Sequence, residues 1–383
     1  MADAAADPKA SRAFERVRVV QIDAEIDALE HRIRLLKVER VTRQQRLEAF
    51  RYPVLTLPNE IVSEIFVHFL PPYPLCPPFA GLLSPTTLTQ ICQKWRDVAQ
   101  TTPRLWRAIS LPRRALKRPV GDEEGWLLES WVSRSARCPL SISMDGRSLI
   151  SWDSNRTLGG LILHRDRWEH LDIDFCYKLD LAKVIGAPMP LLRTLSFKES
   201  GVTADPVLFR DVPLLRSLST DSLSCRADFL PWSQLTFLKL SNPGTFLHIP
   251  LRETVNLQHL ELFITGEHEG EGIGDIRLPQ LETLLISPCW ALGSRAVTQF
   301  LDAFTLPRLR TLQIPDAFLG EEPVHALSSF ISRSACKLQT AVIIVYGLVF
   351  EDAYREALPT IPDLSFIMKE NYPESLYLGS PEF

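Results

Sequence analysis

The first strong pattern along the chain is an apolar residue at alternating steps of three and four positions. The residues in this row are Val19, Ile22, Ile26, Leu29, Ile33 and Leu36. A row of this kind forms the apolar stripe that coiled-coil helices bury between them. Arg40 and Arg43 occupy the next two places, and Pro53 ends the helix. We predict an N-terminal tail and a coiled-coil helix in residues 1–51. An isolated helix of this length is marginally stable, so residues 19–36 should pair as a homodimer or fold back on the chain.

Two shorter amphipathic patterns follow. The first lies in residues 57–70, where Pro58 occupies a helix start and therefore loses no hydrogen bond. Its stripe contains Ile61, Ile65 and Phe69, with Val62 and Phe66 beside it. Ser84 and Pro85 open the second helix as a capping residue followed by proline, and this helix ends near Pro103. Its stripe contains Leu88, Ile91, Cys92, Trp95 and Val98. The prolines of residues 71–78 predict an extended, semi-rigid loop between the two helices.

From residue 168 onward, a six-residue pattern of the type Leu-x-x-Leu-x-Leu recurs at steps of 20 to 29 residues. Its copies are WEHLDI, LRTLSF, LRSLST, LTFLKL, LQHLEL, LETLLI, LRTLQI and the degenerate LQTAVI. Their fourth positions are Leu171, Leu195, Leu218, Leu238, Leu260, Leu284, Leu312 and Ala341. Each copy predicts one short strand, and the longest spacers show helical periodicity at residues 297–304 and 324–331. Upstream, residues 126–137 predict a helix and residues 140–142 a strand, which together begin the array.

These motifs resemble two known families. Leu-Pro-x-Glu-Ile from Leu57, Cys92 with Trp95-Arg96, and Pro103-x-Leu105-Trp106 resemble the F-box, and the six-residue pattern is the signature of leucine-rich repeats. The whole chain is similar in style to the F-box proteins with degenerate leucine-rich repeats found in fungi. We therefore expect an α+β chain: a coiled-coil helix, an F-box-like domain in residues 52–112, an irregular α/β leucine-rich-repeat solenoid in residues 113–370, and a tail in residues 371–383. The competing arrangement is a run of βα units in an open sheet.

The F-box resemblance implies a non-catalytic function. In that family the motif docks onto a Skp-type adaptor and through it onto a cullin scaffold of a ubiquitin ligase. On this analogy, the adaptor-binding residues would be Leu57, Pro58, Ile61, Ile65, Leu88, Ile91, Cys92, Trp95 and Trp106. For Ile61, Ile65, Leu88 and Ile91, burial inside the helical unit has equal weight, because core and interface residues look alike in sequence. The loop after Leu70 is also longer than the family's short link between its first two helices.

The residues between the leucines should share the opposite face of the predicted strands, because strand side chains alternate. A protein target would contact this face. The candidate target-binding residues are Asp172, Lys198, Phe237, Lys239, His259, Glu261 and Phe263. Phe237 and Phe263 are the expected anchors, since aromatic residues are frequent among binding hot spots. The alternative is a solvated face on which Lys239 simply pairs with Glu261 across the ladder.

Composition narrows the partner class. The formal net charge of −4 gives no reason to expect nucleic acid or membrane binding, so the partner should be a protein. The seven cysteines lack the close spacing of a disulfide framework or a zinc site. We therefore expect a reducing compartment, the cytoplasm or nucleus. We expect no secretory signal, since acidic residues appear early in the chain and no apolar run follows them.

Candidate chemistry is sparse. No cysteine stands in a recognisable nucleophile or zinc setting, so we expect no catalytic residues, metal or cofactor. The leading hypothesis is a substrate-receptor subunit of a cullin-based ubiquitin ligase. The alternative is a scaffold that uses the coiled coil to dimerise and the repeats to bind, without ligase function.

Overall fold

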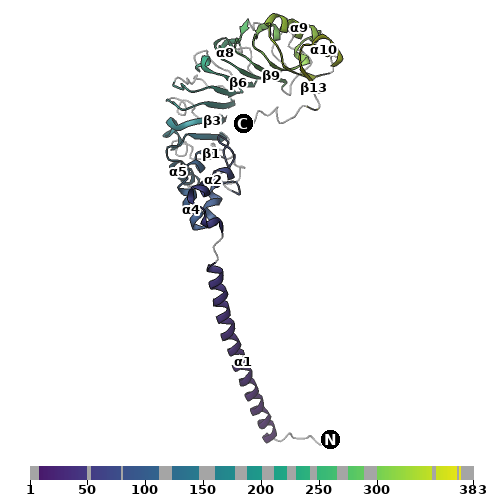
Figure 1. The fold of residues 1–383 in the computed structure, drawn as a ribbon. Helices are drawn as coiled ribbons and strands as arrows, with labels where there is room; N and C mark the ends of the chain where they lie inside the picture. Colours follow the sequence, from purple (N-terminus) through teal and green to yellow (C-terminus); the bar gives the residue numbers. More distant parts are fainter. Residues whose placement is uncertain are drawn as a thin grey trace. The chain divides into compact units, whose positions relative to one another are not determined.

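The computed structural model describes most of the chain: residues 8–49, 53–78, 81–111, 123–145, 160–176, 188–200, 211–221, 230–241, 248–264, 275–288, 300–346, 351–368 and 371. The chain divides into two compact units, Met1–Val62 and Ser63–Phe383. The first contains a long helix and the second contains a parallel sheet (Figure 1). The fold is therefore mixed α/β, with an N-terminal helix and a large parallel sheet, and this confirms the coarse part of the α+β prediction.

Helix α1 (Pro8–Ala49) dominates the first unit and is followed by the short 3-10 helix η1 (Pro53–Thr56). With 42 residues, α1 is about 63 Å long. Its described residues from position 12 onward are all exposed, including the predicted stripe, in which Ile22 is 40% exposed and Leu29 61%. The charged pairs Glu30–Arg34 and Glu39–Arg43, at 3.6 and 3.4 Å, connect successive turns of the helix. The predicted helix is confirmed, and its coiled-coil pairing stays a prediction.

Helix α2 (Asn59–Phe69) begins one residue after the predicted proline start, because the carbonyl of Pro58 accepts the hydrogen bond from Val62 N at 3.1 Å. Val62 and Phe66 are buried. The stripe of Ile61, Ile65 and Phe69 is exposed instead, at 49%, 48% and 38%. Ile61 and Ile65 are therefore exposed, and the alternative that they are buried inside the helical unit is wrong.

The single helix predicted after Ser84 is wrong, because the structure contains two: α3 (Pro85–Ile91) and α4 (Gln93–Gln100). Cys92 separates them in an extended conformation, with φ −156° and ψ 168°. The break is stabilised by Arg96, whose Nε donates to the carbonyl of Thr89 at 2.8 Å and so satisfies a backbone group at the end of α3. The predicted cap is confirmed: Ser84 Oγ accepts from Thr86 N at 3.2 Å. The 3-10 helix η2 (Pro103–Leu105) follows α4.

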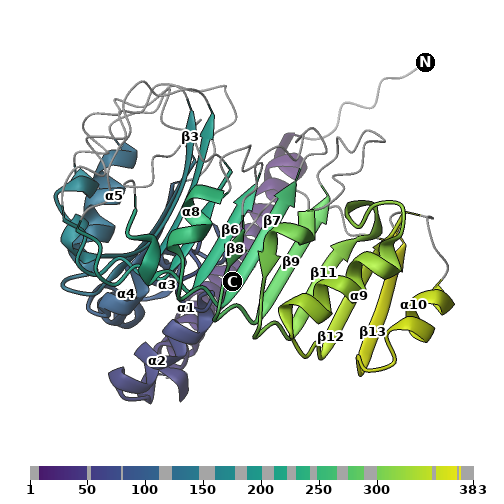
Figure 2. The same cartoon turned by 90° about the horizontal axis from the view of Figure 1, so that it is seen from above.

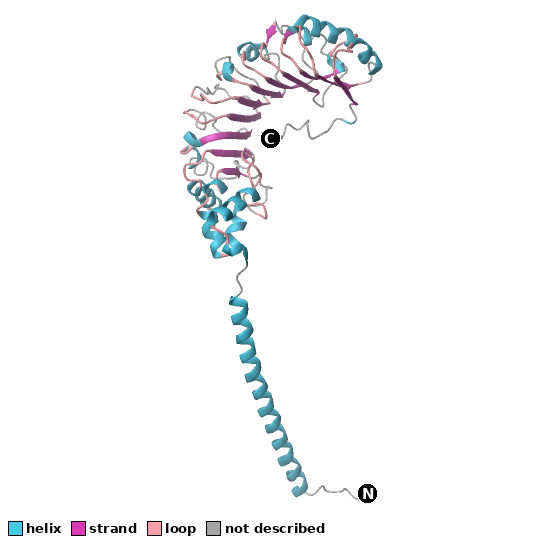
Figure 3. Ribbon diagram, in the orientation of Figure 1, coloured by secondary structure: helices cyan, strands magenta, loops and turns pink. Residues whose placement is uncertain are grey.

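Eleven strands of the described residues form one open parallel sheet in the second unit. The strands are β1 (Ala108–Leu111), β2 (Leu140–Asp145), β3 (Trp168–Cys176), β4 (Thr194–Ser200), β5 (Ser217–Thr220), β6 (Phe237–Ser241), β7 (His259–Ile264), β9 (Thr283–Pro288), β11 (Thr311–Pro315), β12 (Thr340–Val345) and β13 (Asp363–Met368). They lie side by side in chain order, with loops and helices between them (Figures 2 and 3). Strands β8 (Ile276–Arg277) and β10 (Phe304–Thr305) pair separately.

The register of the sheet follows the sequence repeat. Leu171 pairs with Leu195, Leu195 with Leu218, and the ladder continues through Leu238, Leu260, Leu284 and Leu312 to Ala341. All eight side chains are at most 1% exposed. The strands predicted from the repeats are confirmed. Strands β1 and β13 were not predicted, and β1 joins the sheet although it lies in the range assigned to the F-box-like domain.

Helices cover the leucine face of the sheet. They are α5 (Glu123–Arg134), α8 (His248–Glu253), α9 (Pro323–Ser334) and α10 (Glu351–Ala357), accompanied by the 3-10 helices η4 (Arg165–Arg167), η5 (Trp232–Gln234), η7 (Phe300–Ala303) and η8 (Asp316–Phe318). Helices α8, α9 and α10 lie on one side of the strands (Figures 1 and 2). Helix α9 confirms the periodicity at residues 324–331. The other helical prediction, residues 297–304, falls partly outside the described residues. The part that the structure describes is the 3-10 helix η7 and then Phe304, which begins β10 and is therefore not helical.

Candidate functional site

The exposed apolar side chains of α2 and α3 are the first candidate site. Ile65 is 48% exposed and Ile91 56%, although Phe66 and Leu88 on the same helices are buried. Among the other predicted adaptor residues, Pro58 is exposed, while Leu57, Cys92 and Trp95 are half-buried. Trp95 packs its ring edge-on against Phe66, with centroids 4.9 Å apart. The isoleucines are thus available to a partner.

The prediction that Leu88 and Trp106 belong to an adaptor surface is wrong for this structure. Leu88 is 4% exposed and Trp106 is fully buried. The Trp106 indole donates to the carbonyl of Ala99 at 2.8 Å and packs edge-on against Trp131, with centroids 5.4 Å apart. Arg134 lies over the Trp106 ring at 4.6 Å. These contacts make Trp106 a core residue that joins α4 to α5.

The proline-rich loop is not a free spacer: it packs on the first strands of the sheet. The Tyr73 hydroxyl donates to Glu169 Oε2 at 2.9 Å, and the Tyr73 ring meets His170 edge-on at 5.3 Å. Arg107 lies 3.8 Å from the centre of the same ring. Ser141 Oγ donates to the carbonyl of Pro74 at 2.6 Å. Burial and the bond to Glu169 raise the pKa of Tyr73 above its ordinary value, so the phenol remains a donor.

The polar face of the sheet, which carries the residues between the leucines, brings five predicted target-binding residues together on β6 and β7. The residues are Phe237, Lys239, His259, Glu261 and Phe263. The rings of Phe237 and His259 are stacked, with centroids 4.7 Å apart. The Glu261 carboxylate accepts from His259 Nε2 at 3.0 Å through one oxygen and lies 3.2 Å from Lys239 Nζ through the other. We call this set the β6–β7 cluster.

The charges in the β6–β7 cluster are compensated internally. Burial alone would raise the pKa of Glu261, but the bond from His259 and the charge of Lys239 outweigh it, so the pKa lies below its ordinary value. The Lys239 ammonium also lies 5.0 Å from the centre of the Phe263 ring. Phe263 is only 8% exposed, so its prediction as a surface anchor is wrong. Phe237 is half-buried and remains the accessible aromatic residue of the pair.

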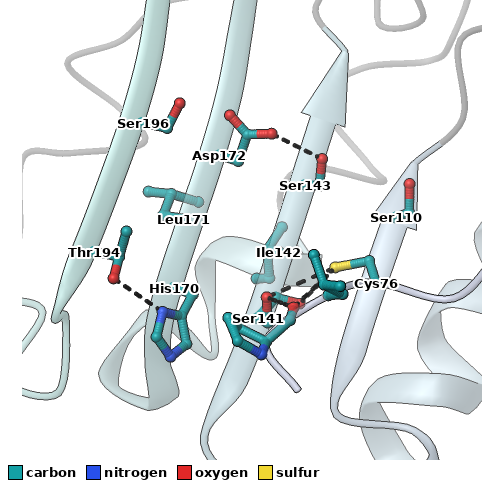
Figure 4. A pocket seen from close by; sticks show the side chains of 12 residues that line it. Cys76, Ser110, Ser141, Ile142, Ser143, His170, Leu171, Asp172, Thr194 and Ser196 are labelled. Atoms are coloured by element: carbon teal, nitrogen blue, oxygen red, sulfur yellow. Dashed lines mark hydrogen bonds between the residues drawn. The ribbon is translucent and has the colours of Figure 1, made fainter. Parts of the chain in front are cut away.

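Asp172 lies apart from that cluster, in a cavity of about 230 Å³ on the polar face (Figure 4). The proline-rich loop forms one wall through Pro74, Leu75 and Cys76, and strands β1 to β4 form the rest. Ser143 Oγ donates to Asp172 Oδ2 at 3.2 Å. His170 Nδ1 and Thr194 Oγ1 are 3.0 Å apart. Lys198 lies on β4 opposite Asp174 in register, and its side chain is outside the described residues.

Cys76 in this cavity wall has a part-buried thiol. The thiol lies 3.7 Å from the carbonyl of Ser141, and burial raises its pKa to about 11. A thiol with this pKa stays protonated at neutral pH. Sequence reasoning did not identify Tyr73, Cys76, Ser141 or Ser143 as site residues. The sequence signal for these residues is the excess of prolines after Leu70. No local sequence pattern indicates that this loop reaches β2 and β3.

Other kinds of site find no support in the described part of the chain. No three His, Cys, Asp or Glu side chains there are grouped so that they could hold a metal ion. Nor does any helix among those residues have the length and apolar character that crossing a membrane requires. Compared with known proteins, the chain matches no family model, and no curated protein is significantly similar to it.

Proposed function

We propose that this chain is the substrate-recognition subunit of a cullin-based ubiquitin ligase. Its F-box-like helices would bind a Skp-type adaptor, and its sheet would bind a protein target. The observation that carries the proposal is the exposure of Ile65 and Ile91 on helices that bury Phe66 and Leu88. Burying one such side chain is worth about 1.5–3 kcal/mol, so a partner that covers them gains binding energy.

The target-binding half of the proposal rests on the sheet, which we take to be a leucine-rich-repeat solenoid. Its strands follow chain order without a reversal, whereas doubly wound α/β sheets reverse their order at a switch point. Each repeat adds one strand and one leucine to a continuous ladder, as stacked repeats do. The polar face then offers side chains from neighbouring strands to one ligand, and the accessible Phe237 is a suitable anchor.

The mechanism would be proximity. A receptor that holds its target beside a ubiquitin-charged enzyme converts a bimolecular encounter into a local one. Such a receptor needs binding residues and no acid, base or nucleophile of its own.

Co-purification with a Skp-type adaptor tests the proposal. The double variant Ile65→Asp with Ile91→Asp places two charges on exposed positions and should abolish adaptor binding without unfolding the chain. The matched control is Leu163→Asp, because Leu163 is an 80% exposed apolar residue that precedes β3. If folded wild-type protein fails to bind the adaptor, or if the double variant binds as well as the control, the proposal is wrong.

A second candidate function, a dimeric scaffold without ligase activity, is favoured by α1. Its stripe from Val19 to Leu36 is exposed on a helix that would be marginally stable alone. A second copy of the helix would bury it. Light scattering in the absence of adaptor should then give the mass of a dimer, and Ile26→Lys with Ile33→Lys should give a monomer. The matched control, Val20→Lys with Val38→Lys, charges exposed positions outside the stripe and should leave the dimer intact.

A further inference from the structure

The cavity beside Asp172 has the composition of a binding site for a charged group. Its volume of about 230 Å³ is far above the roughly 10–15 Å³ that one water molecule requires. Hydroxyl side chains of Ser141, Ser143, Thr194 and Ser196 contribute to its lining, and each hydroxyl has lone pairs that can accept hydrogen bonds. The cavity can therefore take a polar group larger than a water molecule.

Asp172 gives the cavity its charge. It is the one carboxylate among the described residues that line the cavity. Its Oδ2 accepts from Ser143, and no hydrogen bond from a described residue reaches its Oδ1. Because the side chain is half-buried, a cation brought to Oδ1 would be attracted more strongly than at an open surface.

The neighbouring charged groups do not neutralise Asp172. Arg193 Nε lies 3.0 Å from Glu169 Oε1, and Tyr73 binds the other oxygen of Glu169. The Arg107 guanidinium lies over the Tyr73 ring. Burial lowers the pKa of His170, so its ring is neutral at neutral pH and contacts Thr194. The cavity thus combines one anion with hydroxyl acceptors.

We propose that this cavity binds a basic side chain, arginine or lysine, of the protein target. The proposal rests on the proposed function, since it names the target chemistry that the polar face recognises. An ammonium or guanidinium group would donate to Asp172 Oδ1 and to the surrounding hydroxyls in a charge-assisted network. The proline-rich loop, the feature that departs most from the F-box pattern, would then build one wall of the recognition site. A metal ion is a poorer occupant, because the cavity supplies only one carboxylate.

The test uses the full-length protein with labelled methyl groups and no adaptor. Nα-acetyl-arginine amide and Nα-acetyl-lysine amide are the probes, and the uncharged isosteres acetyl-citrulline amide and the amide of N-acetyl-2-aminoheptanoic acid are their controls. We expect a basic probe to shift the methyl signals of Leu75 and Thr194, which line the cavity, with a dissociation constant in the millimolar range. The signal of Leu284 on β9 should not move. Each isostere should bind about tenfold or more weakly than its charged counterpart.

Asp172→Asn should weaken the basic probe by a similar factor while keeping the bond from Ser143. Its matched control is Asp352→Asn at an exposed position in α10, which should leave binding in the cavity unchanged. Equal binding of charged and uncharged probes, no shift with any probe, or full binding by the folded Asp172→Asn variant would each overturn the proposal. The isostere comparison needs no substitution, so it stands even if a variant misfolds. Adaptor co-purification is independent of these results, so failure here is distinguishable from failure of the receptor proposal.

Discussion

Helix α1 and the parallel sheet contain the same kinds of large apolar side chain, but they bury them very differently. In α1, the predicted stripe is 40–61% exposed. In the sheet, every member of the leucine ladder from Leu171 to Leu312 is at most 1% exposed. Both regions show strong periodicity in the sequence, at the helical and the strand period respectively.

The difference teaches that periodicity predicts an element but not the partner that covers it. The repeat in the sheet supplies its own partner, because each strand meets the next copy of the same pattern. The stripe of α1 has no second copy of itself later in the chain. Therefore either another molecule covers its apolar surface, or α1 is a helix of low intrinsic stability.

The largest effect is expected in the ladder. Leu260→Ala should lower the free energy of unfolding by about 2–5 kcal/mol, because a fully buried leucine leaves a cavity between two strands. Val255→Ala, at a 47% exposed position four residues after Leu251, should change it by less than about 1 kcal/mol. Urea unfolding followed by circular dichroism measures both. Similar losses for the two variants would mean that the ladder is not the stabilising core.

A smaller loss is expected for a buried polar group of the same region. Asp316 is fully buried, and its Oδ1 accepts from Tyr346 N at 3.0 Å just after β12. Asp316→Ala should cost about 1–3 kcal/mol, because it removes the carboxylate that accepts from the part-buried Tyr346 N. Asp316→Asn keeps an acceptor at the same place and should cost less. The two variants can be compared by urea unfolding at neutral pH, and equal losses would exclude a contribution from this hydrogen bond.

Much of the sheet could be predicted from the sequence. The aligned residues of the eight repeats, seven leucines and Ala341, are the residues that pair in register, because a repeat fixes both the strand and its offset. Strand β13 was missed, since Leu364 pairs with Ala341 but lies in DLSFIM, which lacks the leucine pattern. The single helix predicted across Cys92 was wrong, because the break depends on a side-chain bond from Arg96 that apolar periodicity does not show.

The candidate site was predicted less completely. The β6–β7 cluster followed from alternation along strands, since register places Lys239 opposite Glu261. Burial of Phe263 did not follow, because alternation assigns a face and not a degree of exposure. Asp172 was predicted as a binding residue, but the cavity around it was not. It depends on Tyr73 and Pro74 reaching residues 96 and 67 positions away in the chain, and such contacts leave no local pattern.

In α1, the effect of a single substitution should depend on protein concentration. Ile33→Ala should lower the unfolding free energy of dilute, monomeric protein by less than about 1 kcal/mol, because Ile33 is 49% exposed and little burial is lost. If the helix pairs with a second copy, hydrogen exchange in α1 should slow as concentration rises, while exchange in β6 stays constant. Fast hydrogen exchange in α1 at every concentration would contradict pairing. The helix and the sheet would then differ only in their intrinsic stability.

The smallest effect should come from Glu261, and it should appear only over part of the pH range. The pKa of this carboxyl in the folded protein lies below its ordinary value of 4.5. The unfolded chain therefore takes up this proton first as the pH falls. The ionised Glu261 stabilises the folded protein fully above about pH 4.5, and this stabilisation is lost as the pH drops through the pKa of Glu261 in the folded protein. Glu261→Gln should cost about 1 kcal/mol or less at neutral pH, and the difference from wild type should shrink in acid.

The control Glu253→Gln, at an exposed position in α8, should show no such dependence. Urea unfolding at several pH values measures this, and a difference that stays constant across the acid range would show that Lys239 and His259 do not hold the charge of Glu261.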